Sequence, residues 1–163
     1  MAGSRNKQGV GLFLKIALLL CLLVFATQAA SEVRLLKGQT VYVPAYSHIY
    51  HGDRVQPLYL AVTLSIRNTD PVHAITIVSI DYFDSDGKLL KRYLEKETKL
   101  TAMASAEYVV KESDRAGGTG ANFVVVWKAE EKVNEPILES VMICTLSQQG
   151  ISFSSRGQAI KEE

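Results

Sequence analysis

Residues 58–68, LYLAVTLSIRN, decide the fold. Apolar side chains occupy every second position of this stretch, at Leu58, Leu60, Val62, Leu64 and Ile66. Alternation with a period of two is typical of a β-strand with one buried face, because successive side chains point to opposite sides. The following NTDP, residues 68–71, is rich in turn-forming residues and predicts the end of the strand.

Further strands are expected on both sides of this one. HAITIVSIDYF (73–83) is rich in β-branched residues, and DSDG (84–87) predicts a hairpin turn into KLLKRYL (88–94). QTVYVPAYSHIY (39–50) reads as a strand interrupted by Pro44, which is typical of an edge strand or a bulge. Later candidates are AEYVVK (106–111), ANFVVVWKA (121–129), ILESVMICTL (137–146) and GISFSS (150–155).

These segments together predict an all-β fold. ILESVMICTL also fits a short helical stripe, but its β-branched content favours a strand. The last six residues, QAIKEE, are expected to fray. Seven to nine short strands separated by turns predict an antiparallel β-sandwich, with an immunoglobulin-like arrangement as the expected version. Trp127 is a candidate core residue, but no cysteine pair flanks it, which excludes an antibody-type domain.

The amino terminus carries an export signal pattern. Arg5, Lys7 and Lys15 precede an unbroken apolar run of 11 residues at 16–26, and the small residues of TQAAS follow. This order predicts a secretory signal peptide at residues 1–30, cleaved after Ala29 or Ala30, and hence a periplasmic or secreted protein. The run is shorter than the roughly 20 residues that span a bilayer. An uncleaved membrane anchor is the alternative.

Removal of the signal leaves a weakly acidic chain. Three of the 18 basic residues lie in the first 30 positions, so the remaining 15 face 17 acidic residues and the net charge is −2. Nucleic-acid binding needs a basic excess, so this class of partner is not expected. Residues 31–163 suit a single domain. Cys144 is then the one remaining cysteine, and its apolar neighbours favour a buried side chain over a nucleophile.

The glycine-rich stretch GGTG (117–120) raises the question of a phosphate site. A nucleotide-binding loop leads into a helix and carries a lysine after its last glycine, whereas Gly120 leads into a predicted strand. A connection between two strands is therefore the favoured interpretation.

Two other short motifs invite a metal hypothesis. DYFDSDGK lacks the first and last ligands of a calcium loop, although Asp81, Asp84 and Asp86 could cluster in another way. His48 and His51 in SHIYHG would point to opposite faces of a strand, and zinc needs at least three protein ligands. Both motifs are weak metal candidates, and no cofactor is expected.

Arg67, Asn68 and Asp70 form a polar group at a strand end, where either ligand binding or capping of the turn is possible. Capping is the favoured interpretation for Asn68 and Asp70, and a surface charge for Arg156. No nucleophile elbow or catalytic triad pattern is present in the sequence, so the chain is not expected to be an enzyme.

Five ordered blocks resemble the bacterial family called domain of unknown function 3124: GQTVYVPAYSHIYHG, TLSIRNTD, DYFDSDGKLLKRYL, GGTGANFVVVW and GISFSSRG. The resemblance covers roughly residues 37–160 and implies a small exported protein, but no activity or cofactor. The polar and glycine positions that match are a candidate binding surface: His48, Tyr50, Arg67, Asn68, Asp81, Gly118, Gly120, Asn122 and Arg156. Val126 departs from the acidic residue that the family favours before the tryptophan.

Two classes of function follow. The first is a non-catalytic binding module of the cell envelope that holds a protein or a glycan through loops or a sheet edge. The alternative is a carrier of a small ligand or a metal.

Overall fold

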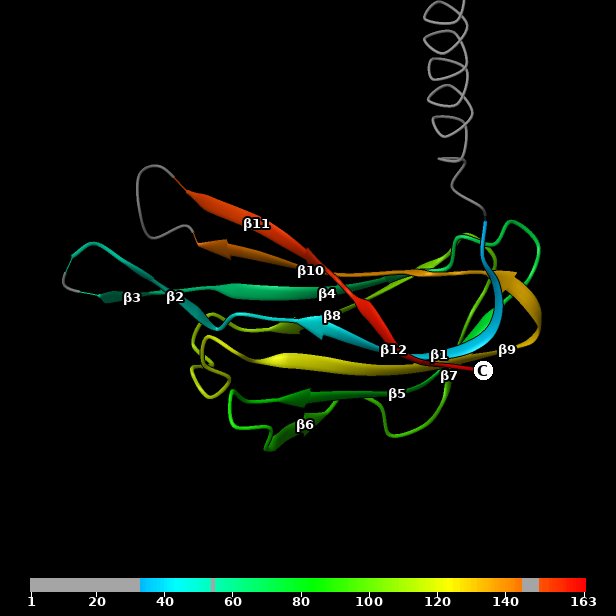
Figure 1. Cartoon of the computed structure of the whole chain (residues 1–163), viewed down its shortest axis with the longest axis horizontal. Helices are drawn as coiled ribbons and strands as arrows, with labels where there is room; N and C mark the ends of the chain where they lie inside the picture. Colours follow the sequence, from blue (N-terminus) through cyan, green and yellow to red (C-terminus); the bar gives the residue numbers. More distant parts are fainter. Residues whose placement is uncertain (1–32, 54, 145–149) are drawn as a thin grey trace, which may run out of the picture. The chain divides into compact units, whose positions relative to one another are not determined.

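The computed structural model describes residues 33–163 except 54 and 145–149. The predicted signal segment, residues 1–30, lies outside the described residues. Twelve strands and no helix occupy the described part of the chain (Figure 1). The strands are β1 (Leu35–Pro44), β2 (His48–His51), β3 (Gln56–Tyr59), β4 (Ala61–Arg67), β5 (Ile75–Phe83), β6 (Leu89–Arg92), β7 (Thr98–Leu100), β8 (Ser105–Val110), β9 (Asn122–Asn134), β10 (Ile137–Cys144), β11 (Ile151–Arg156) and β12 (Gln158–Glu162).

The strands form three sheets, and every pairing is antiparallel. The larger sheet has the order β12-β1-β9-β5-β6, with β7 also paired to β5. A four-stranded sheet has the order β11-β10-β4-β8, and β2 and β3 form a separate hairpin. No helix in these residues is long and apolar enough to cross a membrane.

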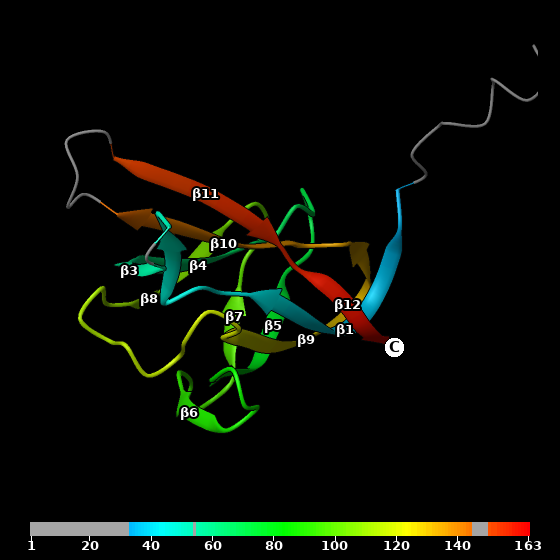
Figure 2. The same ribbon diagram turned by 60° about the vertical axis from the view of Figure 1, so that its left-hand side comes forward.

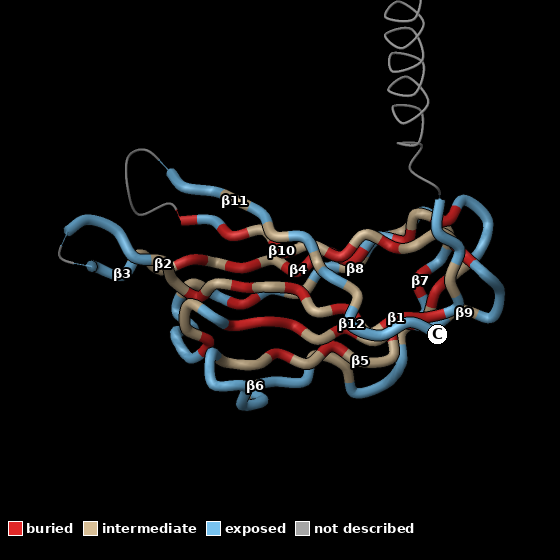
Figure 3. Tube along the Cα trace, viewed as in Figure 1, coloured by how far each residue is buried: buried red, intermediate tan, exposed pale blue. Residues whose placement is uncertain are grey.

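The apolar core lies between the larger sheet and the four-stranded sheet (Figure 3). Leu60, Val62, Leu64 and Ile66 are fully buried, as the alternation in residues 58–68 predicts. The sole tryptophan, Trp127 on β9, is 1 % exposed, which confirms it as a core residue. Burial of large apolar side chains from both sheets supplies the main favourable free energy of folding.

Several local predictions are confirmed. β5 and β6 form the expected hairpin, and the φ of +78° at Gly87 is the left-handed conformation that an Asp-Gly turn requires. The Asp84 carboxylate stabilises this turn by accepting from the amides of Asp86 and Lys88 at 2.9 and 2.8 Å. Residues 137–144 form strand β10, so the helical alternative for this segment is wrong.

Other predictions are wrong in detail. The stretch 58–68 is two strands, because the chain leaves the β2–β3 hairpin at Leu60, whose amide donates to Ser47 O at 3.0 Å. Pro44 lies in neither an edge strand nor a bulge: β1 pairs on both sides and ends at Pro44. A proline fits there because β12 pairs only with the Gln39–Tyr42 part of β1 and requires no amide from Pro44.

The strand count and the carboxyl terminus also need correction. The described residues form twelve strands, whereas the sequence predicts seven to nine. Several of the strands have only three to five residues, too few to show a clear alternation. The tail does not fray at residues 158–162, which form β12 and pair with β1.

Gly157 lets the chain pass from one sheet to the other. β11 belongs to the four-stranded sheet and β12 to the larger sheet, and this glycine is the single residue between them (Figure 2). A Cβ at Gly157 would lie 2.8 Å from Val41 Cγ1 and 3.1 Å from Leu138 O. The close approach explains why no side chain fits at this crossover.

Candidate functional site

The glycine loop is held by neighbouring side chains. Residues 111–121 connect β8 to β9, as the sequence predicts. Ser85 Oγ donates to Gly117 O at 3.0 Å and accepts from the amide of Gly120 at 2.9 Å. Gly118 O accepts from the amide of Ser47 at 2.9 Å. Two of these loop groups are carbonyl oxygens, which cannot donate to a phosphate, and the Gly120 amide already donates to Ser85. The loop also leads into strand β9 and not into the helix that a nucleotide-binding loop needs.

His48 and Tyr50 lie on the β2–β3 hairpin. The His48 ring packs edge-on against Tyr50, with ring centroids 5.1 Å apart, and is tilted against Tyr59 at 5.9 Å. The His48 Nδ1 atom is buried and has no hydrogen-bond partner within the described residues. His51 is exposed at the far end of β2. The hairpin is thus an aromatic cluster around one half-buried histidine.

The three aspartates of DYFDSDGK have separate roles. Asp81 lies 3.7 Å from Arg92 across the β5–β6 hairpin, whereas the Asp84 carboxylate caps the turn and Asp86 is exposed. Asn122 begins β9 and is 9 % exposed between the ends of β1 and β5. Over residues 33–163 without 54 and 145–149, no three His, Cys, Asp or Glu side chains are placed to hold a metal ion together.

The Asn68 side chain, at the end of β4, joins the loop that follows β4 to the loop that follows β7 through hydrogen bonds. Its side-chain amide donates to His73 O and Thr101 O at 2.8 and 2.9 Å, and its Oδ1 accepts from the amide of Asp70 at 3.0 Å. With 2 % of its surface exposed, Asn68 has little area available to a ligand.

Asp70 stabilises the same junction. Its carboxylate accepts from the amides of His73 and Val72 at 2.7 and 2.9 Å, and from that of Asn134 at 3.1 Å. These bonds, those from His73 and Val72 first, lower the pKa of Asp70 to about 2, because they favour the charged form. The geometry of Asn68 and Asp70 is that of turn capping.

Arg67 and Glu139 form an ion pair on the outer face of the four-stranded sheet. Arg67 lies at the end of β4, and its guanidinium is 3.4 Å from Glu139 Oε1 on β10. Glu139 is also in register with Arg156 on β11, although no ion pair joins these two residues among the described ones. Strand register thus brings candidate binding residues from distant segments of the sequence onto one exposed surface.

The same face carries a partly exposed strip of three aliphatic residues, Val109, Val141 and Ile143, with Thr63 between Val109 and Val141; we call these four residues the apolar strip. Val109, Thr63 and Val141 are cross-strand neighbours on β8, β4 and β10, and Ile143 follows on the same face of β10. Val109 is 53 % exposed and Ile143 is 44 % exposed. Strand alternation places Glu107, Arg67 and Glu139 at one end of this strip.

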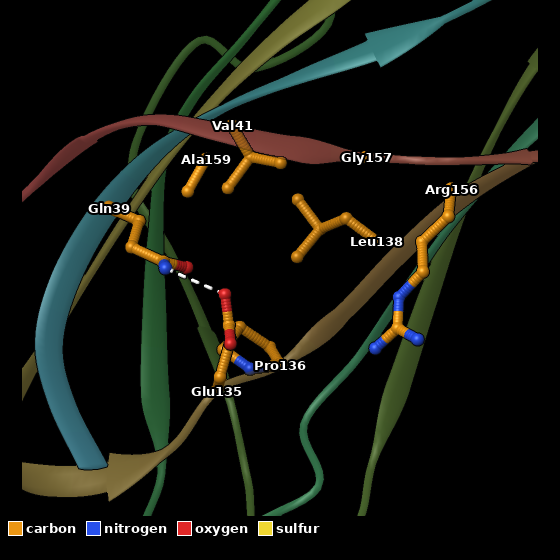
Figure 4. Close-up of a pocket in the computed structure, with 8 residues that line it drawn as sticks. All are labelled: Gln39, Val41, Glu135, Pro136, Leu138, Arg156, Gly157 and Ala159. Carbon is orange, nitrogen blue, oxygen red and sulfur yellow. Dashed lines mark hydrogen bonds between the residues drawn. The ribbon is translucent and has the colours of Figure 1, made fainter. Parts of the chain in front are cut away.

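A cleft opens beside this face where β11 crosses to become β12. It has a volume of about 200 Å³ and lies between β1, the start of β10 and β12 (Figure 4). Its lining residues are Gln39, Val41, Glu135, Pro136, Leu138, Arg156, Gly157 and Ala159. Figure 4 shows Glu135 and Arg156 on opposite sides of the apolar residues Val41 and Leu138.

The Glu135 carboxylate is positioned from the core. Gln39 is 2 % exposed, and its amide nitrogen donates to Glu135 Oε1 at 2.7 Å while its Oε1 accepts from the indole of Trp127 at 3.2 Å. Arg34 Nη1 lies 3.8 Å from Glu135 Oε2, and Arg34 also pairs with Glu162. The cleft therefore has a fixed negative group on one wall and a guanidinium on the other.

Sequence reasoning identified Arg156 but missed Gln39, Glu135 and the apolar strip. Gln39 lies within a predicted strand, and only its alignment with Trp127 across β1 and β9 reveals that its amide is buried. Val109 and Ile143 belong to strands that were predicted, but whether they are buried depends on the side of each strand that faces the core.

Comparison with known proteins identifies the family of this chain. Residues 38–160 match the family model described as "Protein of unknown function (DUF3124)". The chain belongs to this family. The crystal structure titled "Crystal Structure of Thermotoga maritima 1070" is similar at 10 % sequence identity and a TM-score of 0.44, over 78 % of this chain and 97 % of that one. No curated protein matches the DUF3124 chain.

Proposed function

We propose that this DUF3124 protein is an exported, non-catalytic binding module that holds an envelope protein on the outer face of the four-stranded sheet. The single observation that carries the proposal is the apolar strip, with Val109 and Ile143 about half exposed on a regular sheet surface. An immunoglobulin-like arrangement is part of the proposal, and two antiparallel sheets around one core support it.

The chemistry of this face suits a protein partner. Recognition surfaces commonly place apolar side chains centrally and charged side chains at the rim. Here the strip is bordered by Arg67, Glu107 and Glu139, so a partner that presents an apolar strip beside opposite charges would be complementary. The rim charges would mainly fix orientation and speed encounter, while the apolar strip would supply most of the affinity.

Export rests on the amino-terminal pattern. A basic start, a short apolar run and small residues at the cleavage position are typical of secretion signals. The cell envelope is therefore the compartment in which we expect the partner.

In-cell photo-crosslinking from single positions tests this function. A photoreactive amino acid replaces Val109 or Ile143 in the full chain, and Ile160 on β12, which is 61 % exposed, is the matched control position. We expect one crosslinked protein from positions 109 and 143, identified by mass spectrometry, and a clear loss of it in the Arg67→Ala variant. Equal crosslinking from position 160, or none from 109 and 143, would reject the proposal.

A further inference from the structure

We propose that the cleft between β1, β10 and β12 is a second binding site, which takes a small zwitterion of the amino-acid class. The ligand's ammonium group binds Glu135 and its carboxylate binds Arg156, above a base that Val41 and Leu138 close. The cleft shares no residue with the apolar strip or its charged border, although Arg156 is in register with Glu139 of that border.

The negative wall of the cleft is pre-organised. Glu135 Oε1 accepts from Gln39, whose amide is locked by Trp127 in the core. A carboxylate held in this way loses little conformational freedom when a ligand binds, which favours affinity. Its second oxygen, Oε2, has Arg34 at 3.8 Å, beyond hydrogen-bond distance.

Arg34 competes only weakly for this oxygen. The Arg34 side chain is 51 % exposed and also pairs with Glu162. Exposed ion pairs contribute little because water screens them. An ammonium group within the cleft can therefore approach Glu135 while Arg34 keeps its contact with Glu162.

The positive wall is Arg156. Within the described residues, no carboxylate lies within ion-pair distance of its guanidinium, since the neighbouring Glu139 pairs with Arg67. A guanidinium offers two parallel N–H donors to a carboxylate, so it recognises that group with defined geometry. Figure 4 shows the Arg156 side chain at the edge of the cleft, on the side away from Gln39.

The floor and the size limit the ligand. Val41 and Leu138 are only 4 % and 3 % exposed, so they close the base of the cleft but offer a ligand little apolar area. The cleft's volume of about 200 Å³ is below the roughly 300–1,000 Å³ of pockets for drug-sized ligands. A single amino acid matches the size of the cleft and the charges of its two walls.

Three leucine derivatives test the assignment. Protein is purified from cells that express the full chain, and amide resonances are followed by NMR during titration with leucine, leucinamide or N-acetylleucine. We expect leucine to shift the amides of Gly157 and Ala159 in a saturable manner. Leucinamide lacks the carboxylate and N-acetylleucine lacks the ammonium, so each should bind about tenfold more weakly.

Two variants assign the walls. Arg156→Ala should remove the preference for leucine over leucinamide, and Glu135→Gln should remove the preference for leucine over N-acetylleucine. Each variant should keep the other preference, which mere distortion of the cleft would not allow. Thermal unfolding checks that both variants fold, and Arg156→Lys, which keeps the charge but not the paired donors, should bind leucine with intermediate affinity.

The proposal has definite contrary outcomes. It is overturned if none of the three compounds shifts the amide resonance of Gly157 or Ala159 at about 10 mM, which is well above a millimolar Kd. Equal binding of leucine and N-acetylleucine by the unmodified protein would also overturn it, because Glu135 would then have no part in recognition. Either result leaves the crosslinking test of the sheet face unaffected.

Discussion

Ser47 Oγ lies 3.0 Å from the hydroxyl oxygen of Tyr82, and this buried pair occupies the space beside Gly117. A Cβ at Gly117 would lie 2.0 Å from the Tyr82 hydroxyl and 2.5 Å from Ser47 Oγ. Burial raises the pKa of Tyr82, so its hydroxyl stays protonated and able to donate. The glycine stretch is therefore needed for packing of the loop against β5.

Gly117→Ala should destabilise the protein by about 2–3 kcal/mol, the upper part of the range for overpacking a filled site. Urea unfolding measures the loss. Gly120→Ala is the matched control, because its Cβ would meet Ser85 Oγ at 3.3 Å and should cost clearly less.

The clash can be relieved in a second background. In the double variant Ser47→Ala/Tyr82→Phe, both oxygens that obstruct the new methyl group are gone, so Gly117→Ala should cost much less there. An equal cost in both backgrounds would mean that the Ser47–Tyr82 pair is not what requires the glycine, and that Ala121, whose Cβ lies 2.8 Å from the new methyl group, or the loop backbone requires it.

Asp70→Asn should change the acid sensitivity of folding. The pKa of Asp70 is lowered to about 2 by the bonds from the amides of His73 and Val72. A depressed carboxyl pKa contributes stability that is present above the unfolded pKa of about 4 and is lost as the pH falls towards 2. The urea midpoint of the unmodified protein should therefore exceed that of Asp70→Asn most at neutral pH. This difference should decrease as the pH falls from about 4 to about 2.

Asp86→Asn is the control for this titration. Asp86 is an exposed carboxylate in the β5–β6 turn, where the Asp84 side chain makes the capping bonds. Its replacement should leave the pH dependence of the midpoint unchanged. A constant gap between the unmodified protein and Asp70→Asn down to a pH of about 2 would refute the role given to the Asp70 charge.

Strand alternation distinguishes two adjacent residues of β10. Met142 is fully buried and Ile143 is 44 % exposed. Met142→Ala should cost about 2–5 kcal/mol through loss of buried area and the cavity that remains. Ile143→Ala should change the free energy of unfolding by less than about 0.5 kcal/mol. Similar losses from both would mean that the outer face is covered, and would remove the basis for a binding surface there.

The sequence predicts the strands better than it predicts the sites. The strand at residues 58–68 can be recognised locally, because the alternation of apolar and other side chains is visible within this short stretch. The β11–β12 crossover depends instead on contact of Gly157 with Val41 and Leu138, which are far away in the sequence. The sequence predicts fraying of QAIKEE because three of its residues are charged and few are apolar. Nothing in it indicates that this segment pairs with β1.

The candidate sites show the same division. Asn68 and Asp70 were expected to cap a turn, and that chemistry is local to NTDP. The ion pair of Arg67 with Glu139 and the alignment of Glu139 with Arg156 follow from strand register, which one sequence without pairing information does not contain. The sequence gives even less indication that Gln39 is buried, because a glutamine in a strand is normally expected on the exposed face.

Gln39→Leu should be destabilising even though it replaces a polar group by an apolar one in the core. The Trp127 indole N–H would lose its acceptor at 3.2 Å and remain buried without a partner, at a cost of about 1–3 kcal/mol. Because Trp127 is the sole tryptophan, its emission reports directly on this site and should move to shorter wavelength in the variant. Gln158→Leu, an exposed change on β12, is the control and should alter neither emission nor stability. Unchanged emission and stability in Gln39→Leu would show that the Trp127–Gln39 bond does not fix the wall of the cleft.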